Sequence, residues 1–195
     1  MKGNDLTKLQ AEERKKQIQN VNYRIQLIID KRSLDYKGRT TISFDFKKHN
    51  RSDKLIVDCI AKEIKYILLN GKKLNKYEKD DFWIYIPTKE LKPCNNTIEI
   101  SHINNYDNTG SGFHRFIDPE DNEVYIHTDF EPYDAHRLFP CFDQPDLKAK
   151  YILTVTGPKE WKYIHNTKIS DQHVEENLIT INFEKTKRFS TYIFA

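Results

Sequence analysis

Apolar and polar residues alternate from residue 21 onward, as in β-strands that bury one face and expose the other. In residues 21–29, for example, polar residues separate Val21, Tyr23 and Ile25. Similar alternation, or a short apolar run, predicts further strands at residues 41–46, 55–57, 64–69, 81–86, 97–103, 123–128, 149–156, 161–165, 177–184 and 189–194. Because no helical segment separates these strands, the expected fold class is all-β, an antiparallel two-sheet β-sandwich.

One turn can be predicted from its own residues. Asn70-Gly71 follows the apolar run 64–69 and precedes Leu74. Asn and Gly tolerate the positive φ angles of a type I′ turn, so this dipeptide predicts a β-hairpin.

Residues 5–20 have a different pattern, which predicts a short N-terminal helix. Thr7 followed by Gln10 fits a capping box, and good helix formers follow. The apolar stripe of this helix is thin, so we expect it to lie on the surface of the domain. A basic helix that binds a membrane surface is the alternative, but Glu12, Glu13 and the missing aromatic residues argue against it.

The composition limits the classes of function. The 195 residues suit one domain, and 11 Tyr, 11 Phe and 2 Trp can build a core although only 37% of the residues are apolar. A net charge of +3 with 31% charged residues is too balanced for a nucleic-acid-binding surface. No apolar run approaches transmembrane length, and the N-terminus has no apolar leader. We therefore expect a cytoplasmic protein with neither nucleic acid nor a membrane as its partner.

The cysteines predict reduced thiols. Cys59, Cys94 and Cys141 are too few, and odd in number, for a disulfide framework. Cys141 is expected to be a small buried apolar side chain.

Residues 127–151, called here the 127–151 segment, are the most distinctive part of the chain. They combine acidic and aromatic residues with Pro132, Pro140 and Pro145, and contain no glycine. Each proline fixes φ and removes a backbone donor, which disfavours a plain strand or helix. This composition indicates a shaped surface that holds a carboxylate in place.

Local spacing in the sequence does not assemble a catalytic centre. None of the seven histidines lies in the His-Glu-x-x-His spacing that places two zinc ligands on one helix face. A serine nucleophile elbow, a phosphate-binding glycine loop and a Walker lysine are also missing. His136 near Cys141 and Asp143 could indicate a metal site or a nucleophile pair, but a packed or surface histidine is the ordinary alternative. We predict no metal ligand and no catalytic residue in this chain.

The 127–151 segment closely resembles the signature of zinc aminopeptidases of the aminopeptidase N family, which are gluzincin metallopeptidases, within their N-terminal domain. The matching residues are Thr128, Phe130, Glu131, Asp134, Ala135, Arg137, Pro140, Cys141, Phe142, Asp143, Gln144, Pro145, Lys148 and Ala149. The likeness continues more weakly in residues 110–116, 158–161 and 189–195, and at Asn166.

This resemblance implies a saddle-like β-sandwich over residues 21–195, preceded by a helical extension at residues 1–20. It also implies that the chain stops within the last strand of that domain and that a catalytic zinc domain would follow. The Zn²⁺ ion, the general base and the hydrolysis of peptides would belong to the full-length parent, so this chain alone is expected to be inactive. Its expected partners are the catalytic domain of the same chain and the N-terminus of a peptide substrate.

The resemblance assigns a substrate-binding role to Glu131. In similar enzymes the matching glutamate reaches into the catalytic cleft and binds the free amine of the substrate. A charge-assisted hydrogen bond of this kind contributes about 1.5–3 kcal/mol. The alternative is that Glu131 pairs with Arg137 or caps a turn.

Asp129 stands where the family has a glutamine that lines the pocket for the first substrate side chain. Two carboxylates two positions apart lie on the same strand face and repel each other if both point into the cleft. We therefore predict a preference for basic or polar N-terminal residues. The alternative is that Asp129 is a surface residue without consequence.

Other residues of the 127–151 segment are expected to shape it. Arg137, Asp134 and Asp143 are predicted to form an ion-pair and turn-capping network. Phe139 and Phe142, like His136, are expected to pack rather than to contact a ligand.

Two other functions remain open from the sequence. The chain could belong to a non-catalytic scaffold or interaction homologue of the same family, which the His-Glu-x-x-His motif in the residues that follow would exclude. It could also be a free-standing binding module for sugars or peptides that uses exposed aromatics such as Trp83, Tyr85 or Trp161.

Overall fold

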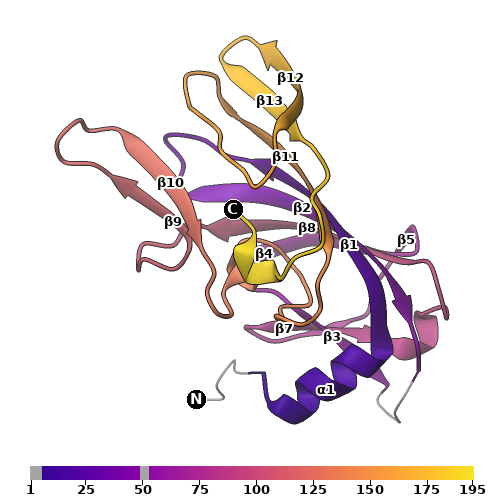
Figure 1. Cartoon of the computed structure of the whole chain (residues 1–195). Helices are drawn as coiled ribbons and strands as arrows, with labels where there is room; N and C mark the ends of the chain where they lie inside the picture. The colour runs from indigo at the N-terminus through magenta and orange to yellow at the C-terminus, as the bar shows by residue number, and fades with distance from the viewer. Residues whose placement is uncertain (1–5, 49–52) are drawn as a thin grey trace.

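A computed structural model of the chain describes residues 6–48 and 53–195, and most of its regular secondary structure is β-strand (Figure 1). One α-helix precedes the strands: α1 (Lys8–Gln17). The strands are β1 (Ile18–Ile28), β2 (Asp35–Phe46), β3 (Lys54–Asp58), β4 (Glu63–Leu69), β5 (Lys72–Lys73), β6 (Glu78–Lys79), β7 (Trp83–Pro87), β8 (Asn96–Asn105), β9 (Gly112–Ile117), β10 (Val124–Asp129), β11 (Lys150–Pro158), β12 (Ile169–Glu175) and β13 (Leu178–Phe183). Short 3-10 helices are η1 (Thr88–Glu90), η2 (Ala135–Arg137) and η3 (Thr191–Ile193).

The strands form one large sheet, one small sheet and a separate hairpin. The eight-stranded sheet has the order β12-β13-β11-β1-β2-β8-β4-β5, and the three-stranded sheet has the order β3-β7-β6. β9 and β10 pair with each other and project from the body of the molecule (Figure 1). A single bridge also joins His114 of β9 to Asp107. The predicted all-β, sandwich-like fold is therefore confirmed.

One strand pair departs from the antiparallel plan. β1 and β11 pair in parallel, from Asn22 opposite Lys150 to Ile28 opposite Thr156. More than a hundred residues separate these strands, so no hairpin signal in the sequence could reveal their direction.

The core joins the large sheet to the 127–151 segment. Tyr23 of β1 stacks on Tyr151 of β11, with ring centroids 5.2 Å apart, and Phe139 packs edge-on against Tyr23 at 5.8 Å. Phe142 packs edge-on against Phe44 of β2. Both Phe139 and Phe142 are fully buried, which confirms the packing role predicted for them. The segment is thus part of the core and not an appended loop.

The predicted hairpin turn is confirmed. Asn70 and Gly71 have φ angles of +52° and +79°, the positive values of a type I′ turn. The turn links β4 to β5, with Leu69 opposite Lys72.

Two predicted strands are wrong. Residues 161–165 lie in a turn region, where the Trp161 amide donates to the carbonyl of Pro158. Residues 189–194 make a single bridge, from Phe189 to Ala149, before the chain turns into η3. β12 was not predicted because all seven of its residues are exposed, so its sequence lacks alternating apolar positions.

Helix α1 is shorter than predicted, and polar residues anchor it. The capping box of Thr7 and Gln10 is present, but the helix ends at Gln17 and β1 begins at Ile18. Leu9 is 69% exposed, whereas Arg14 and Gln17 are buried. In the part of the chain that the structure describes, no helix is long and apolar enough to cross a membrane.

Candidate functional site

The 127–151 segment begins on β10 and crosses the molecule before it enters β11. β10 ends at Asp129, Phe130 follows, and the Glu131–Pro132 peptide bond is cis. The chain then forms η2 (Ala135–Arg137). Phe130 is 1% exposed, so it fixes the end of the strand to the core.

Asp129 and Glu131 flank this buried anchor, and both are exposed. Since Phe130 points inward, its two neighbours are directed away from the core, as strand alternation requires. Among the described residues, neither carboxylate has a hydrogen bond or an ion pair within the chain. Both acids therefore remain available to a partner outside this chain.

Arg137 does not pair with Glu131, contrary to the alternative considered from the sequence. Its Nε lies 2.6 Å from Asp134 Oδ1, and its Nη1 lies 3.0 Å from Asp107 Oδ1. Arg137 therefore holds the loop before β9 against the turn after β10.

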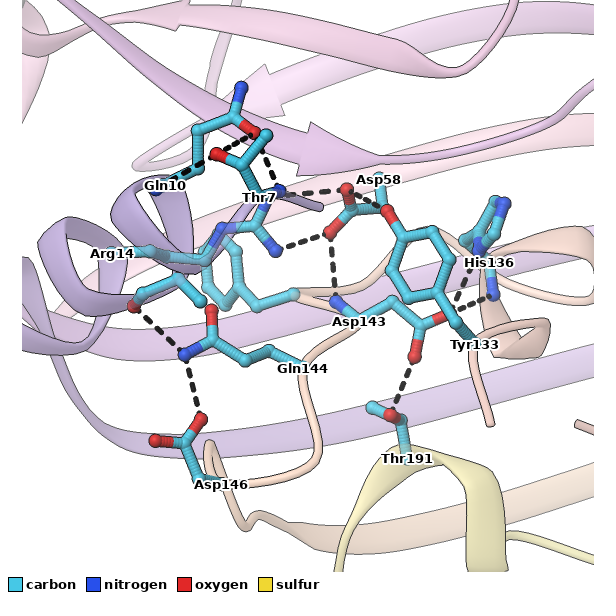
Figure 2. A network of polar contacts seen from close by, with 12 residues as sticks. Thr7, Gln10, Arg14, Asp58, Tyr133, His136, Asp143, Gln144, Asp146 and Thr191 are labelled. Atoms are coloured by element: carbon cyan, nitrogen blue, oxygen red, sulfur yellow. Dashed lines mark hydrogen bonds and ion pairs between the residues drawn. The ribbon is translucent and has the colours of Figure 1, made fainter. Parts of the chain in front are cut away.

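The predicted network of Arg137, Asp134 and Asp143 is correct only for the first two residues. Asp143 is buried, and its Oδ2 accepts from the backbone amide of His136 and lies 2.8 Å from His136 Nδ1. Its Oδ1 accepts from Thr191 Oγ1 at 2.6 Å (Figure 2). Asp143 therefore connects η2 to η3, since it contacts His136 of η2 and Thr191 of η3.

A buried carboxylate that the sequence analysis missed lies on β3 and contacts the 127–151 segment. Asp58, the last residue of β3, is fully buried and accepts from Arg14 of α1, from Tyr133 Oη and from the Asp143 amide (Figure 2). Asp58 and Cys141 also form a backbone bridge. An aspartate directly after the apolar run 55–57 was the available signal, since an acid that ends a buried strand needs a partner.

The cysteines are free, and two of them are buried. Burial raises the pKa of Cys59 to about 12 and that of Cys141 well above its usual value. Both side chains are therefore thiols at neutral pH, which argues against Cys141 as a nucleophile.

The described residues do not fit a zinc coordination sphere. In residues 6–48 and 53–195, no three His, Cys, Asp or Glu side chains are grouped as metal ligands. His136 donates to or accepts from Asp143, and its Nε2 is buried without a partner in the described part of the chain.

The aromatic residues considered for a free-standing binding module are partly buried. Trp161 packs against the core, and Tyr85 Oη donates to Asp80. These contacts favour a structural role for both side chains.

A groove of about 600 Å³ runs between α1 and the 127–151 segment. Its walls include Ala11 and Lys15 on the helix, and Pro132, Tyr133 and Pro145 on the segment. The helix therefore lies directly beside the turn that carries Glu131.

Comparisons with known proteins identify relatives of this chain. The family model described as the peptidase M1 N-terminal domain matches residues 19–193. Aminopeptidase N of Streptomyces lividans is 34% identical over the whole chain, which covers 22% of that relative. Probable aminopeptidase 1 of Sulfurisphaera tokodaii is 31% identical over 87% of the chain and 20% of its own length. Glutamyl aminopeptidase of Homo sapiens is 33% identical over 60% of the chain and 13% of its own length. The chain thus spans about a fifth of the length of the first two relatives.

Proposed function

The chain belongs to the family of peptidase M1 N-terminal domains, and we propose that it is the N-terminal domain of a zinc-dependent aminopeptidase. The longer enzyme would remove N-terminal residues from peptides, with zinc and the reacting groups in a neighbouring catalytic domain. In this proposal the domain has no catalytic centre of its own. Its partners are the catalytic domain of the same polypeptide and the N-terminus of the substrate. The cytoplasmic location stays a prediction from the sequence.

Within this enzyme, Glu131 would bind the free amine of the substrate. The supporting observation is its geometry: an exposed carboxylate follows a buried aromatic anchor, Phe130, and has no partner within the described residues. An aminopeptidase must distinguish an N-terminal ammonium from an internal amide. A fixed carboxylate does this because only the ammonium carries the opposite charge and forms a hydrogen bond in which both partners are ionised.

The test is Glu131→Gln in the longer enzyme. The amide keeps the size of the side chain and removes its charge, so kcat/KM for free-amine peptides should fall on the order of tenfold to a hundredfold. Glu175→Gln on the exposed strand β12 is a matched control and should retain wild-type kinetics. For substrates with an acetylated amine, the Glu131→Gln variant and the wild type should have similar kcat/KM values. Wild-type kcat/KM for free-amine peptides in Glu131→Gln would refute the assignment.

The alternative is a scaffold or interaction homologue of the same family that lacks catalysis. The longer polypeptide distinguishes the two functions directly. A His-Glu-x-x-His motif with a further glutamate ligand supports the enzyme, whereas their absence supports the scaffold.

A further inference from the structure

Helix α1 lies outside the residues 19–193 matched by the family model, yet a buried ion pair joins it to Asp58 of β3, and Asp58 in turn contacts the 127–151 segment. The Arg14 side chain is 5% exposed and that of Asp58 is 0% exposed. Arg14 Nη1 lies 2.6 Å from Asp58 Oδ2, and Nη2 lies 3.1 Å from Oδ1 (Figure 2). This two-pronged geometry fixes the guanidinium and the carboxylate relative to each other.

The same carboxylate holds the turn that carries Glu131. Tyr133 Oη donates to Asp58 Oδ1 at 2.8 Å, the oxygen that Arg14 Nη2 also reaches. Burial and the adjacent Asp58 charge raise the pKa of Tyr133, so its hydroxyl stays a donor. Tyr133 is two residues from Glu131, and only Pro132 lies between them. Tyr133 therefore connects Asp58 to the Glu131 turn.

Two further contacts hold the helix against the segment beyond this turn. Gln144 Nε2 donates to the backbone carbonyl of Ala11 at 2.9 Å, and Lys15 pairs with Asp146 at 2.7 Å. Gln144 is buried, whereas the side chains of Lys15 and Asp146 are 59% and 48% exposed. The Lys15–Asp146 ion pair thus lies on the same helix as Arg14 but does not include Asp58.

We propose that Arg14 is a positioning residue for the substrate amine, and that it acts through Asp58 and Tyr133 on the direction of Glu131. This inference rests on the proposed function of Glu131. Without Arg14, Asp58 would lose its charged partner, and among the described residues Tyr133 and the Asp143 amide would remain as donors to it. The carboxylate would then move toward solvent or toward another donor, and the Glu131 turn would move with it.

A double-mutant cycle in the longer enzyme tests this proposal. Arg14→Met should lower kcat/KM for free-amine peptides by about tenfold, mainly through KM, because a misplaced carboxylate binds the amine poorly. In the Glu131→Gln background the same substitution should change kcat/KM by less than about twofold, since no carboxylate remains to be positioned. Lys15→Met is the matched control and should leave kcat/KM unchanged.

Two further variants separate positioning from loss of folding. Tyr133→Phe removes the hydrogen bond from the turn to Asp58 and leaves the Arg14–Asp58 ion pair in place. It should therefore lower kcat/KM in the otherwise wild-type enzyme as Arg14→Met does, but not in the Glu131→Gln background. Asp58→Asn combined with Arg14→Met removes both charges, and should recover part of the activity lost in Arg14→Met alone. Hydrogen exchange of the amides in residues 130–134 should be faster in Arg14→Met, but not in Lys15→Met.

The outcomes distinguish this proposal from the proposed function. If Glu131→Gln is as active as the wild type, the amine-binding role is wrong, and the positioning role is wrong with it. If Glu131→Gln is impaired but Arg14→Met and Tyr133→Phe lower kcat/KM equally in both backgrounds, only the positioning role is wrong. Unchanged exchange in residues 130–134 of Arg14→Met would overturn it as well.

Discussion

Asp129, the last residue of β10, and the two residues that follow it alternate between exposed and buried positions. Phe130 is buried, while Asp129 and Glu131 on either side of it are exposed. The buried ring keeps the backbone in place, so the two acids need no internal partner to stay oriented. The extended backbone around Phe130 therefore determines the positions of the two carboxylates, and no ion pair among the described residues does so.

Asp129 is expected to influence which N-terminal residue the longer enzyme prefers. Asp129→Gln removes a negative charge beside Glu131 and introduces a neutral polar side chain that is one methylene longer. The ratio of kcat/KM for an Arg substrate to that for a Leu substrate should fall by up to about fivefold, the size expected for an exposed ion pair. Steady-state kinetics with Arg, Ala and Leu substrates provide the measurement. An unchanged ranking of the three would show that Asp129 is a surface residue without consequence.

Strands β2 and β8 approach each other closely where they support the 127–151 segment. Gly38 lies opposite His102 in the register of the two strands. A Cβ atom on Gly38 would overlap the imidazole ring of His102, which is 1% exposed. The glycine is therefore required by close packing across the sheet and not by a turn.

Gly38→Ala is expected to destabilise the fold by about 1–3 kcal/mol, because the ring has no free space to move into. Chemical denaturation gives the free energy of unfolding. In the His102→Ala background the same substitution should have a much smaller effect, since the overlapping ring is gone. Equal effects in the two backgrounds would show that another contact causes the strain.

The large sheet and the 127–151 segment are joined by hydrogen bonds as well as by aromatic packing. His102 Nε2 donates to the carbonyl of Leu138 at 3.2 Å, and Tyr36 Oη donates to the same carbonyl at 2.9 Å. Asn104 donates to the carbonyl of Arg137 at 2.8 Å. The segment therefore unfolds together with the sheet, which makes its stability a property of the whole domain.

The stability of the whole domain should fall in mild acid through His102. Burial lowers the pKa of His102 to about 4, from an unfolded value of about 6.5. A group with a depressed folded pKa is neutral in the fold, so unfolding takes up a proton below pH 6.5. The contribution of His102 is thus fully present above pH 6.5 and is lost as the pH falls to about 4, by roughly 3 kcal/mol.

His102→Gln provides the control, because an amide can still donate to Leu138 but does not titrate. The wild type should lose more unfolding free energy than His102→Gln between pH 7 and pH 4, as measured by denaturant titrations. Acidic groups shared by both proteins cancel in this difference. Parallel pH profiles would refute the assignment.

The amino-acid sequence was sufficient for the features that depend on neighbouring residues. Alternation predicted most strands, Asn70-Gly71 predicted its turn, and Thr7 with Gln10 predicted the start of α1. Glu131 and Asp129 could be selected as candidates from the sequence, because the 127–151 segment is distinctive over a continuous stretch, and their substrate-binding role stays a prediction.

Contacts between distant residues became visible only in the folded chain. The parallel pairing of β1 with β11 and the Arg14–Asp58–Tyr133 connection each join residues far apart in sequence. A periodic pattern reports which face of a strand is buried, but not which distant residue will cover it. Which residue covers that face depends on how the sheets pack around a shared core, and a buried charge in that core requires a partner of opposite charge.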